Sequence, residues 1–530
     1  MARSHKGVSV NISDRNTHRY NWYQWLVCCF AFCALPVLAA EKTDDAAVQR
    51  GAYLVNAGDC AACHTAKGGK PFAGGLYMPT PFGEIATPNI TPDRQTGIGA
   101  WTDDQFYRLM HEGVGPKGEY IYPVMPFPWY TIVTRDDVAA IRAYLNTVAP
   151  VRKAQEPNRL KFPASIRSSL LAWRTLFFEP RDFKRDPALS DAVNRGDYLV
   201  NGLAHCGECH NGRPGFGATS DHRKVLAGGV IDNWYAPNIS SDARDGVGSW
   251  SNDQLATYLK TGVSPNGGVA AGPMAETVHS LSKLNDGDLL AIAAYLKTTK
   301  PQAAPAGKQH DLYAGIHARG GDTYLSFCVS CHGVEGRGLE GVIPALADNG
   351  AVKAAGPQDV INVVLGGLHA REGYAPMLAI GAGMTDVQIA DVANYVRQNW
   401  DNKAPPTAEP GMVAKLRADS ATAMNPGSAA DCRPRTLSQR ALKISKQPIA
   451  SSDVMAAWTA TDVALRIDGL VSQVRKTAAK TPTADLVNGL TSGYCSALVR
   501  AGHLDRKERA LQLGHFSELV YSAATGQKLN

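Results

Sequence analysis

The chain has 530 residues, of which 44% are hydrophobic and 19% charged, as in folded globular proteins, and its length predicts several domains. The net charge of +6 falls to +3 without residues 1–40, where four basic residues face one acidic residue. So small a net charge gives no reason to expect a nucleic-acid partner.

Residues 1–40 are predicted to be a secretory signal peptide. Basic residues precede the apolar run WLVCCFAFCALPVLAA, and the small residues at its end suit cleavage after Ala39 or Ala40. The alternative is an uncleaved anchor, but the run is shorter than the ~20 apolar residues of a membrane-spanning helix. No later segment reaches that length, so we expect an exported, periplasmic chain that does not span a bilayer.

Three copies of the motif C-x-x-C-H follow, and this motif is the attachment signature of c-type haem. They consist of Cys60, Cys63 and His64; Cys206, Cys209 and His210; and Cys328, Cys331 and His332. Cysteines three residues apart on a helical turn point the same way, so both can bind one porphyrin while the histidine binds its iron. A thioredoxin-like dithiol would not occur three times, and a zinc site would need a second ligand pair. We therefore predict three covalently bound haem c groups.

The first two motifs lie in a long internal repeat. The matching segments are RGAYLVNAGDCAACH (50–64) and RGDYLVNGLAHCGECH (195–210), TPNIT (87–91) and APNIS (236–240), and GIGAWTDDQ (97–105) and GVGSWSNDQ (246–254). From Pro88 onward the offset between the two units is 149 residues. The third unit, from about residue 313 to 400, is shorter.

Helix signals recur in the same positions. Thr102 with Gln105, and Ser251 with Gln254, form predicted capping boxes, and glycines at 113 and 262 suit the helix ends. Apolar periodicity predicts a closing helix in each unit, at 136–147, 286–298 and 386–400. These patterns predict a mainly α protein with three tandem cytochrome c-like helical domains and a C-terminal helical module.

The expected boundaries are a signal peptide at 1–40, cytochrome c domain 1 at 41–150, a linker at 151–190, domain 2 at 191–300, domain 3 at 301–402, and a linker with the C-terminal helical module at 403–530.

Each haem iron needs a sixth ligand, and methionine is the usual partner of histidine in electron-transfer cytochromes c. Met125 lies in YPVMPFP of the first unit, and the offset of 149 places Met274 at the same position of the second. Met110 corresponds to Leu259 and is expected in the core, and Met78 lies in a segment that the second unit shortens. Met125 and Met274 are therefore the predicted ligands.

In the third unit Met377 competes with Met384. Met125 precedes the closing-helix Tyr144 by 19 residues and Met377 precedes Tyr395 by 18, whereas Met384 precedes it by only 11. Met377 is therefore the third predicted ligand. With both axial positions of every iron filled, the chain is expected to transfer electrons, and no catalytic residue is predicted.

The segments outside the haem units leave alternatives open. The aromatic side chains of residues 165–183 either lie on a membrane surface or pack between haem domains, which is the favoured alternative. Residues 436–530 have helical periodicity but no haem motif, and they either dock a partner subunit or cover the haem units. Cys432 and Cys495 are left over in an exported chain, so they are predicted to pair as a disulfide; buried free thiols are the alternative.

Residues 50–400 resemble the three-haem cytochrome c subunit of bacterial membrane-bound dehydrogenases, the alcohol, gluconate, fructose and sorbitol dehydrogenase group. The resemblance rests on the three motifs, the repeated PNI…W block, and the YPVMP and GPMAE segments. It implies that the chain is not an enzyme on its own. Such subunits take electrons from a catalytic subunit carrying flavin, quinone (PQQ) or molybdenum cofactor, and pass them to ubiquinone or a terminal oxidase at the periplasmic face of the inner membrane.

The tail departs from this family, because such subunits end soon after the third unit. The rival function is a free-standing periplasmic multihaem electron carrier without a dedicated dehydrogenase. Three haems on one chain favour a fixed electron relay over a diffusing carrier. A catalytic haem enzyme would require one methionine assignment to be wrong.

Overall fold

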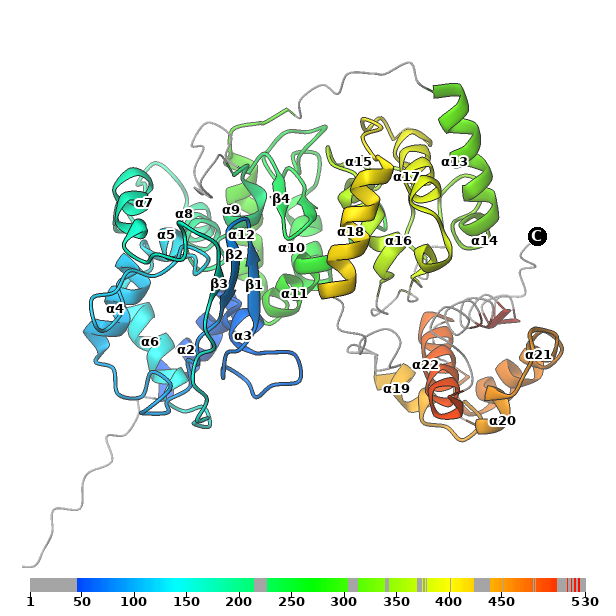
Figure 1. Ribbon diagram of the computed structural model, residues 1–530, viewed down its shortest axis with the longest axis horizontal. Helices are drawn as coiled ribbons and strands as arrows, with labels where there is room; N and C mark the ends of the chain where they lie inside the picture. Colours follow the sequence, from blue (N-terminus) through cyan, green and yellow to red (C-terminus); the bar gives the residue numbers. More distant parts are fainter. Residues whose placement is uncertain are drawn as a thin grey trace, which may run out of the picture. The chain divides into compact units, whose positions relative to one another are not determined.

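The helices begin and end where local side-chain chemistry caps them. In the computed structural model (Figure 1), the Thr102 hydroxyl accepts from the Gln105 backbone N–H and the Gln105 side chain accepts from the Thr102 N–H; Ser251 pairs with Gln254 in the same way. The glycines at 113 and 262 end these helices in the left-handed conformation. Both predicted capping boxes and both helix ends are confirmed.

The structure describes residues 45–213, 226–303, 313–338, 343–368, 374, 377, 379–400, 402–423, 439–450, 452–479, 481, 483–502, 512, 516, 519–520 and 523–524. The predicted signal peptide and Cys432 lie outside these residues. Among the described helices, none has the length and apolar character needed to cross a bilayer.

The first repeat unit combines helices with a small antiparallel sheet. Its elements are α2 (Asp45–Ala57), α3 (Cys60–His64), β1 (Tyr77–Thr80), β2 (Gly83–Ala86), α4 (Asp103–Glu112), α5 (Phe127–Tyr130), α6 (Arg135–Leu145), β3 (Arg159–Leu160) and α7 (Ser169–Phe177). The strand order is β1-β2-β3, with Tyr77 opposite Ala86 and Gly83 opposite Leu160. The linker after α6 therefore returns to the first unit and adds a strand to it.

The second unit repeats this order without the third strand. Its elements are α8 (Asp191–Tyr198), the π-helical turn η1 (Leu199–Leu203), α9 (Gly207–His210), β4 (Gly229–Ile231), β5 (Trp234–Ala236), α10 (Asn252–Thr261), α11 (Gly272–Leu281) and α12 (Asp286–Thr298). Strands β4 and β5 are antiparallel, with Val230 opposite Tyr235. The predicted closing helix at 286–298 is confirmed.

The third unit and the tail are helical in their described parts. The third unit contains α13 (Tyr313–Phe327), α14 (Val329–His332), α15 (Gly350–Lys353), α16 (Gln358–Gly366), the 3-10 turn η3 (Ile380–Gly383) and α17 (Asp386–Gln398), and α18 (Pro410–Ala423) follows. The tail contains α19 (Gln439–Ser445), α20 (Asp453–Ala456), α21 (Ala460–Thr477) and α22 (Thr483–Ala501). The tail has its own apolar core, which includes Leu490, Tyr494 and Cys495.

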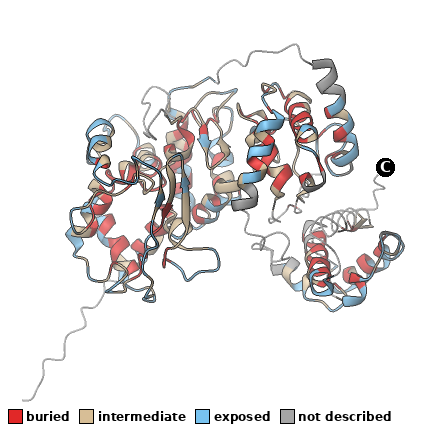
Figure 2. Cartoon of the chain, in the orientation of Figure 1, coloured by how far each residue is buried: buried red, intermediate tan, exposed pale blue. Residues whose placement is uncertain are grey.

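A close helix crossing recurs in all three units. Gly51 in α2, Gly196 in α8 and Gly320 in α13 each lie against the backbone of the closing helix of their unit. A β-carbon on any of these glycines would overlap a backbone carbonyl oxygen of that helix. Figure 2 shows buried residues along the facing sides of these helices. The helices thus approach more closely than side chains would allow, which builds the core of each small unit.

We predict that Gly196→Ala destabilises the second unit by about 1–3 kcal/mol, because its methyl group would overlap the Ala291 carbonyl oxygen. Guanidinium unfolding followed by haem absorbance and circular dichroism measures this. The control is Gly469→Ala in α21, where nothing lies within 4 Å of the new methyl group and alanine should stabilise the helix by up to about 1 kcal/mol. Equal effects of the two substitutions on stability would contradict the close approach of α8 to α12.

Candidate haem sites

Each C-x-x-C-H motif forms one short helical turn. Helix α3 contains the whole first motif, and Cys206 and Cys328 stand at the starts of α9 and α14. None of the six motif thiols is in a disulfide bond. Burial raises the pKa to about 12 for Cys60, Cys63, Cys206, Cys209 and Cys328. A redox-active dithiol needs a lowered thiol pKa, so these surroundings fit thioether attachment better than dithiol chemistry.

Every motif histidine donates its Nδ1–H to the carbonyl oxygen of a proline. The pairs are His64 with Pro88 at 2.8 Å, His210 with Pro237 at 2.6 Å, and His332 with Pro344 at 3.1 Å. The tautomer is thereby fixed, and Nε2 remains for a metal. Burial lowers the pKa of all three imidazoles, to about 4 for His332, so each ring is neutral as a ligand must be.

A glycine in each unit makes room for the proline carbonyl. The N–H groups of Gly74, Gly228 and Gly338 donate to the carbonyl oxygens of His64, His210 and His332. All three glycines have positive φ, and a β-carbon on them would press on the proline backbone. Neither the glycines nor the prolines are predicted from the sequence, although the repeated PNI block contains the first two prolines.

The predicted sixth ligands lie in different settings. His210 and Met274 line one cavity with His332 and Met377, whereas Met384 is buried in the core and is not among the lining residues. Met125 packs half-buried against the apolar core that Cys60 also contacts. These placements agree with the assignment by spacing, which stays a prediction.

The cavity that contains the second and third motifs has a volume of about 1250 Å³. This exceeds the roughly 300–1,000 Å³ of single-ligand pockets. Cysteine thiols, a histidine Nε2 and apolar walls meet in it, which is the donor set that covalent haem requires. The motif residues therefore fit haem c.

The first two motif turns face each other across the contact between their units. The Tyr130 hydroxyl donates to the Gly58 carbonyl oxygen at 3.3 Å, within the first unit. Across the contact, the Trp129 indole N–H donates to Glu208 in the second motif at 2.8 Å, and the Ser280 hydroxyl donates to Asp59 beside the first motif at 2.5 Å. Each turn is thus contacted by a residue of the other unit.

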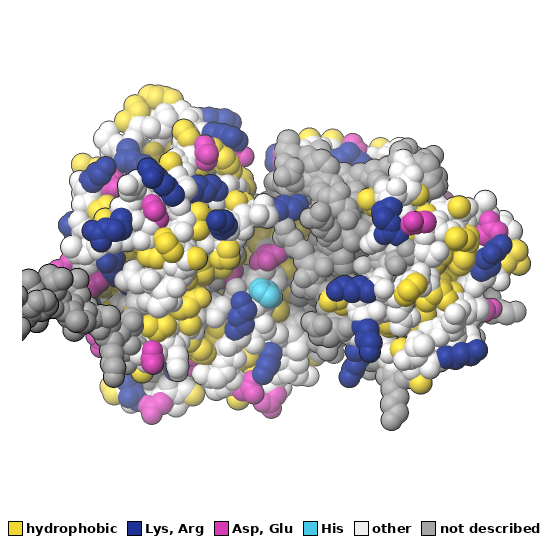
Figure 3. All heavy atoms as spheres, turned by 90° about the horizontal axis from the view of Figure 1, so that it is seen from below, with side chains coloured by type: hydrophobic (Ala, Val, Ile, Leu, Met, Phe, Trp, Pro, Cys, Tyr) yellow, Lys and Arg dark blue, Asp and Glu magenta, His cyan; other side chains and the backbone are white. Residues whose placement is uncertain are grey.

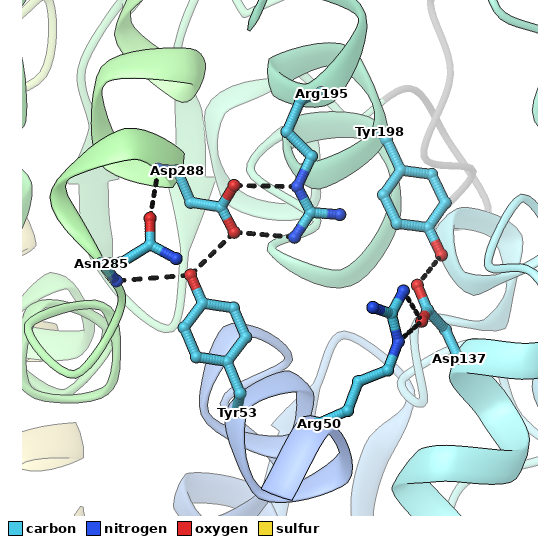
Figure 4. A network of polar contacts seen from close by, with 7 residues as sticks. All are labelled: Arg50, Tyr53, Asp137, Arg195, Tyr198, Asn285 and Asp288. Carbon is cyan, nitrogen blue, oxygen red and sulfur yellow. Dashed lines mark hydrogen bonds and ion pairs between the residues drawn. The ribbon is translucent and has the colours of Figure 1, made fainter. Parts of the chain in front are cut away.

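A reciprocal exchange of tyrosines holds this contact (Figure 4). In the first unit Arg50 pairs with the buried Asp137 at 2.6 Å, and the Tyr198 hydroxyl of the second unit donates to the same carboxylate at 2.6 Å. In the second unit Arg195 pairs with Asp288, and Tyr53 of the first unit donates to it at 2.7 Å.

The two exchanged tyrosines also form hydrogen bonds with the N-caps of the closing helices. Tyr198 accepts from the backbone N–H of Thr134, and Tyr53 accepts from that of Asn285; both residues are N-caps. Burial alone would raise the pKa of Asp288, but the hydrogen bonds from Arg195 and Tyr53 outweigh it and lower the pKa below the usual range.

The aromatic segment at 165–183 packs against the first unit. Trp173 of α7 and Phe178 both contact Phe127 edge-on, with ring centroids 6.4 and 4.8 Å apart. On the face seen in Figure 3, Lys and Arg side chains are interspersed with Asp and Glu. Cys495 is disulfide-bonded, and its predicted partner Cys432 lies outside the described residues.

Three helical units, each with a C-x-x-C-H turn and an oriented neutral histidine, define a c-type cytochrome. The cytochrome c family matches residues 48–149 and 317–400. The chain is 38% identical to the gluconate 2-dehydrogenase cytochrome c subunit of Pantoea cypripedii over 423 residues, covering 74% of this chain and 94% of the relative. It is 37% identical to the cytochrome c subunit of alcohol dehydrogenase (quinone) of Gluconacetobacter polyoxogenes, with 75% and 90% covered.

A diheme c-type cytochrome of Cereibacter sphaeroides is 39% identical over 269 residues, which are 49% of this chain and 88% of that protein. The chain belongs to the family of dehydrogenase cytochrome c subunits. It is an electron-transfer subunit and not the catalytic subunit of such a complex.

We predict that Tyr198→Phe costs about 1–3 kcal/mol of unfolding free energy, because the buried Asp137 loses a hydrogen bond from across the contact. Denaturant unfolding of the haem-loaded protein measures the loss. Tyr144→Phe is the control, since the Tyr144 hydroxyl makes no hydrogen bond with a described residue. A loss of the same size in both variants would argue against the exchange.

Proposed function

We propose that the chain carries three covalent haem c groups and relays electrons from a dehydrogenase catalytic subunit to ubiquinone or a terminal oxidase. The observation that carries this proposal is the threefold recurrence of a C-x-x-C-H turn whose histidine donates to a proline carbonyl. The match to the diheme relative covers only 49% of this chain, so it does not limit the whole chain to two haems.

The axial ligands in this proposal are the three motif histidines and three methionines. The pairs are His64 with Met125, His210 with Met274, and His332 with Met377. When bound, a haem iron with these ligands takes up and releases single electrons. The chain's own residues hold the imidazoles neutral and oriented, and largely apolar walls line the cavity that contains the second and third motifs.

The partner is proposed to be a dehydrogenase that oxidises an alcohol, a sugar or an aldehyde, with flavin, PQQ or molybdenum as its cofactor. Relatives named as gluconate, alcohol and fructose dehydrogenase subunits support this class of donor. We place the chain at the periplasmic face of the inner membrane after removal of residues 1–40. The tail at 436–530 is proposed to dock a partner subunit, because its helices form a separate apolar core.

The haem load is the first test. A pyridine haemochrome assay of protein matured with haem-attachment machinery should give three haems per chain. Cys209→Ala should remove most of one haem, because a thioether to the second site is lost, while Ala61→Ser at the exposed variable position of the first motif should leave three. Two or fewer haems in the unmodified protein would contradict the proposal.

The second test concerns the source of electrons. The purified chain should be reducible yet inactive toward alcohols, sugars and aldehydes, and adding the dehydrogenase subunit should reduce its haems only when substrate is present. Omitting the chain should stop quinone reduction while dye reduction by the dehydrogenase continues. Turnover by the isolated chain would indicate a haem enzyme, and a native preparation without a dehydrogenase would indicate a free-standing carrier.

A further inference from the structure

One side of helix α7 is exposed and carries no charged residue. Leu171, Ala172, Thr175 and Leu176 are all exposed, and their spacing by three and four positions places them on neighbouring rows of the helix. Figure 2 draws most of α7 in the colours of intermediate and exposed residues. An exposed helix side in a globular protein is normally polar or charged, so this side is unusual for a surface that meets only water.

The opposite side of α7 fixes the helix to the first unit. Leu170 is buried, and Trp173 contacts Phe127 edge-on. The Arg174 guanidinium donates to the Glu112 carbonyl oxygen at 2.5 Å and lies 5.5 Å from the Phe127 ring centroid. Because these contacts would break if the helix rotated, the two outward leucines stay exposed.

Further apolar side chains precede the helix. Phe162 and Ile166 are 80% and 48% exposed, and Leu171 and Leu176 are 54% and 73% exposed. Of the 13 large hydrophobic residues exposed in the described part of the chain, these four fall within the 15 residues from 162 to 176. This short segment therefore holds a larger share of the exposed large hydrophobic residues than its length would predict.

The same segment is basic. Residues 159–185 contain seven Lys or Arg and two acidic residues, a net charge of +5, which exceeds the +3 of residues 41–530 together. Lys161, Arg181 and Lys184 are exposed and form no ion pair with a described residue. Exposed cations close in the sequence to an exposed apolar helix side complement an anionic lipid surface, where apolar side chains enter the acyl boundary and cations meet phosphate groups.

We propose that α7 and the preceding residues 161–168 dock on the surface of a membrane that contains anionic phospholipid. This inference rests on the proposed function, which places the chain at the inner membrane. A dehydrogenase subunit is the other occupant considered. Lipid is favoured because the outward side of α7 offers no free hydrogen-bond donor: the Thr175 hydroxyl already donates to the Leu171 carbonyl oxygen at 2.9 Å. Protein interfaces normally use about one hydrogen bond per 100–200 Å².

The test measures co-sedimentation of the haem-loaded full chain with vesicles. Vesicles of phosphatidylethanolamine and phosphatidylglycerol should bind it about tenfold more tightly than phosphatidylcholine vesicles, and added salt should weaken binding. The double variant Leu171→Gln with Leu176→Gln should lose about tenfold or more of that binding. The matched control is Leu465→Gln, which alters a leucine that is 78% exposed in α21 and should bind as the unmodified chain does.

Unchanged haem spectra and circular dichroism establish that the double variant folds. Equal vesicle binding by the double variant and the unmodified chain overturns the proposal. If the double variant binds vesicles normally but no longer assembles with the dehydrogenase in detergent, the membrane proposal is also overturned. The outward side of α7 would then be a contact surface for a protein partner. Electron transfer from the dehydrogenase to a soluble acceptor in detergent needs no membrane, so its failure in the unmodified chain would count against the proposed function and not against docking.

Discussion

The hydrogen bond from each motif histidine to a proline carbonyl is the constraint on which the haem sites depend. The C-x-x-C-H turn alone places an imidazole beside two thiols, but it leaves the ring free to turn and to choose its tautomer. The proline carbonyl removes both freedoms and leaves Nε2 as the ligand atom. Because His210 and His332 are buried and His64 is half-buried, an unbonded Nδ1–H would also cost free energy, so the same contact stabilises the fold.

This constraint explains why the segment after each motif must return to it. His64 and Pro88 are 24 residues apart, His210 and Pro237 are 27 apart, and a strand pair lies between them in each case. In the third unit only 12 residues separate His332 from Pro344, yet a glycine with positive φ still donates to the histidine carbonyl oxygen. The third unit is shorter because it reaches the same geometry with less chain.

The features that could be predicted correctly from the sequence are mostly those that depend on short local patterns. The capping boxes, the glycine helix ends and the closing helices depend on residues within one or two turns, and the structure contains them, although the helix expected at 136–147 runs from Arg135 to Leu145. The proline carbonyls and the Tyr53 and Tyr198 exchange were not predicted, because they join groups far apart in the chain and a backbone carbonyl has no residue-type signature. The segment at 165–183 shows the same limit: its aromatic residues indicated packing, but only the structure separates the side that packs from the side that does not.

The tyrosine exchange sets the first two units apart from the third. Arg319 pairs with Asp391 in the third unit as Arg50 does with Asp137, but Asp322 stands where the other units have their tyrosine. An aspartate could not donate to a neighbouring carboxylate, and two like charges would repel. The third unit instead meets the second through the β4–β5 strand pair: the Tyr235 N–H donates to Asp359 at 2.7 Å.

The second unit therefore uses different surfaces toward its two neighbours. Its α8 and α12 helices take part in the reciprocal exchange with the first unit, and its strand pair contacts the third. Because a reciprocal exchange needs a tyrosine from both partners, it joins only two units and cannot propagate to a third. The departure at Asp322 is thus the residue-level reason why a threefold repeat in sequence gives two unlike contacts, with the second unit contacting both others.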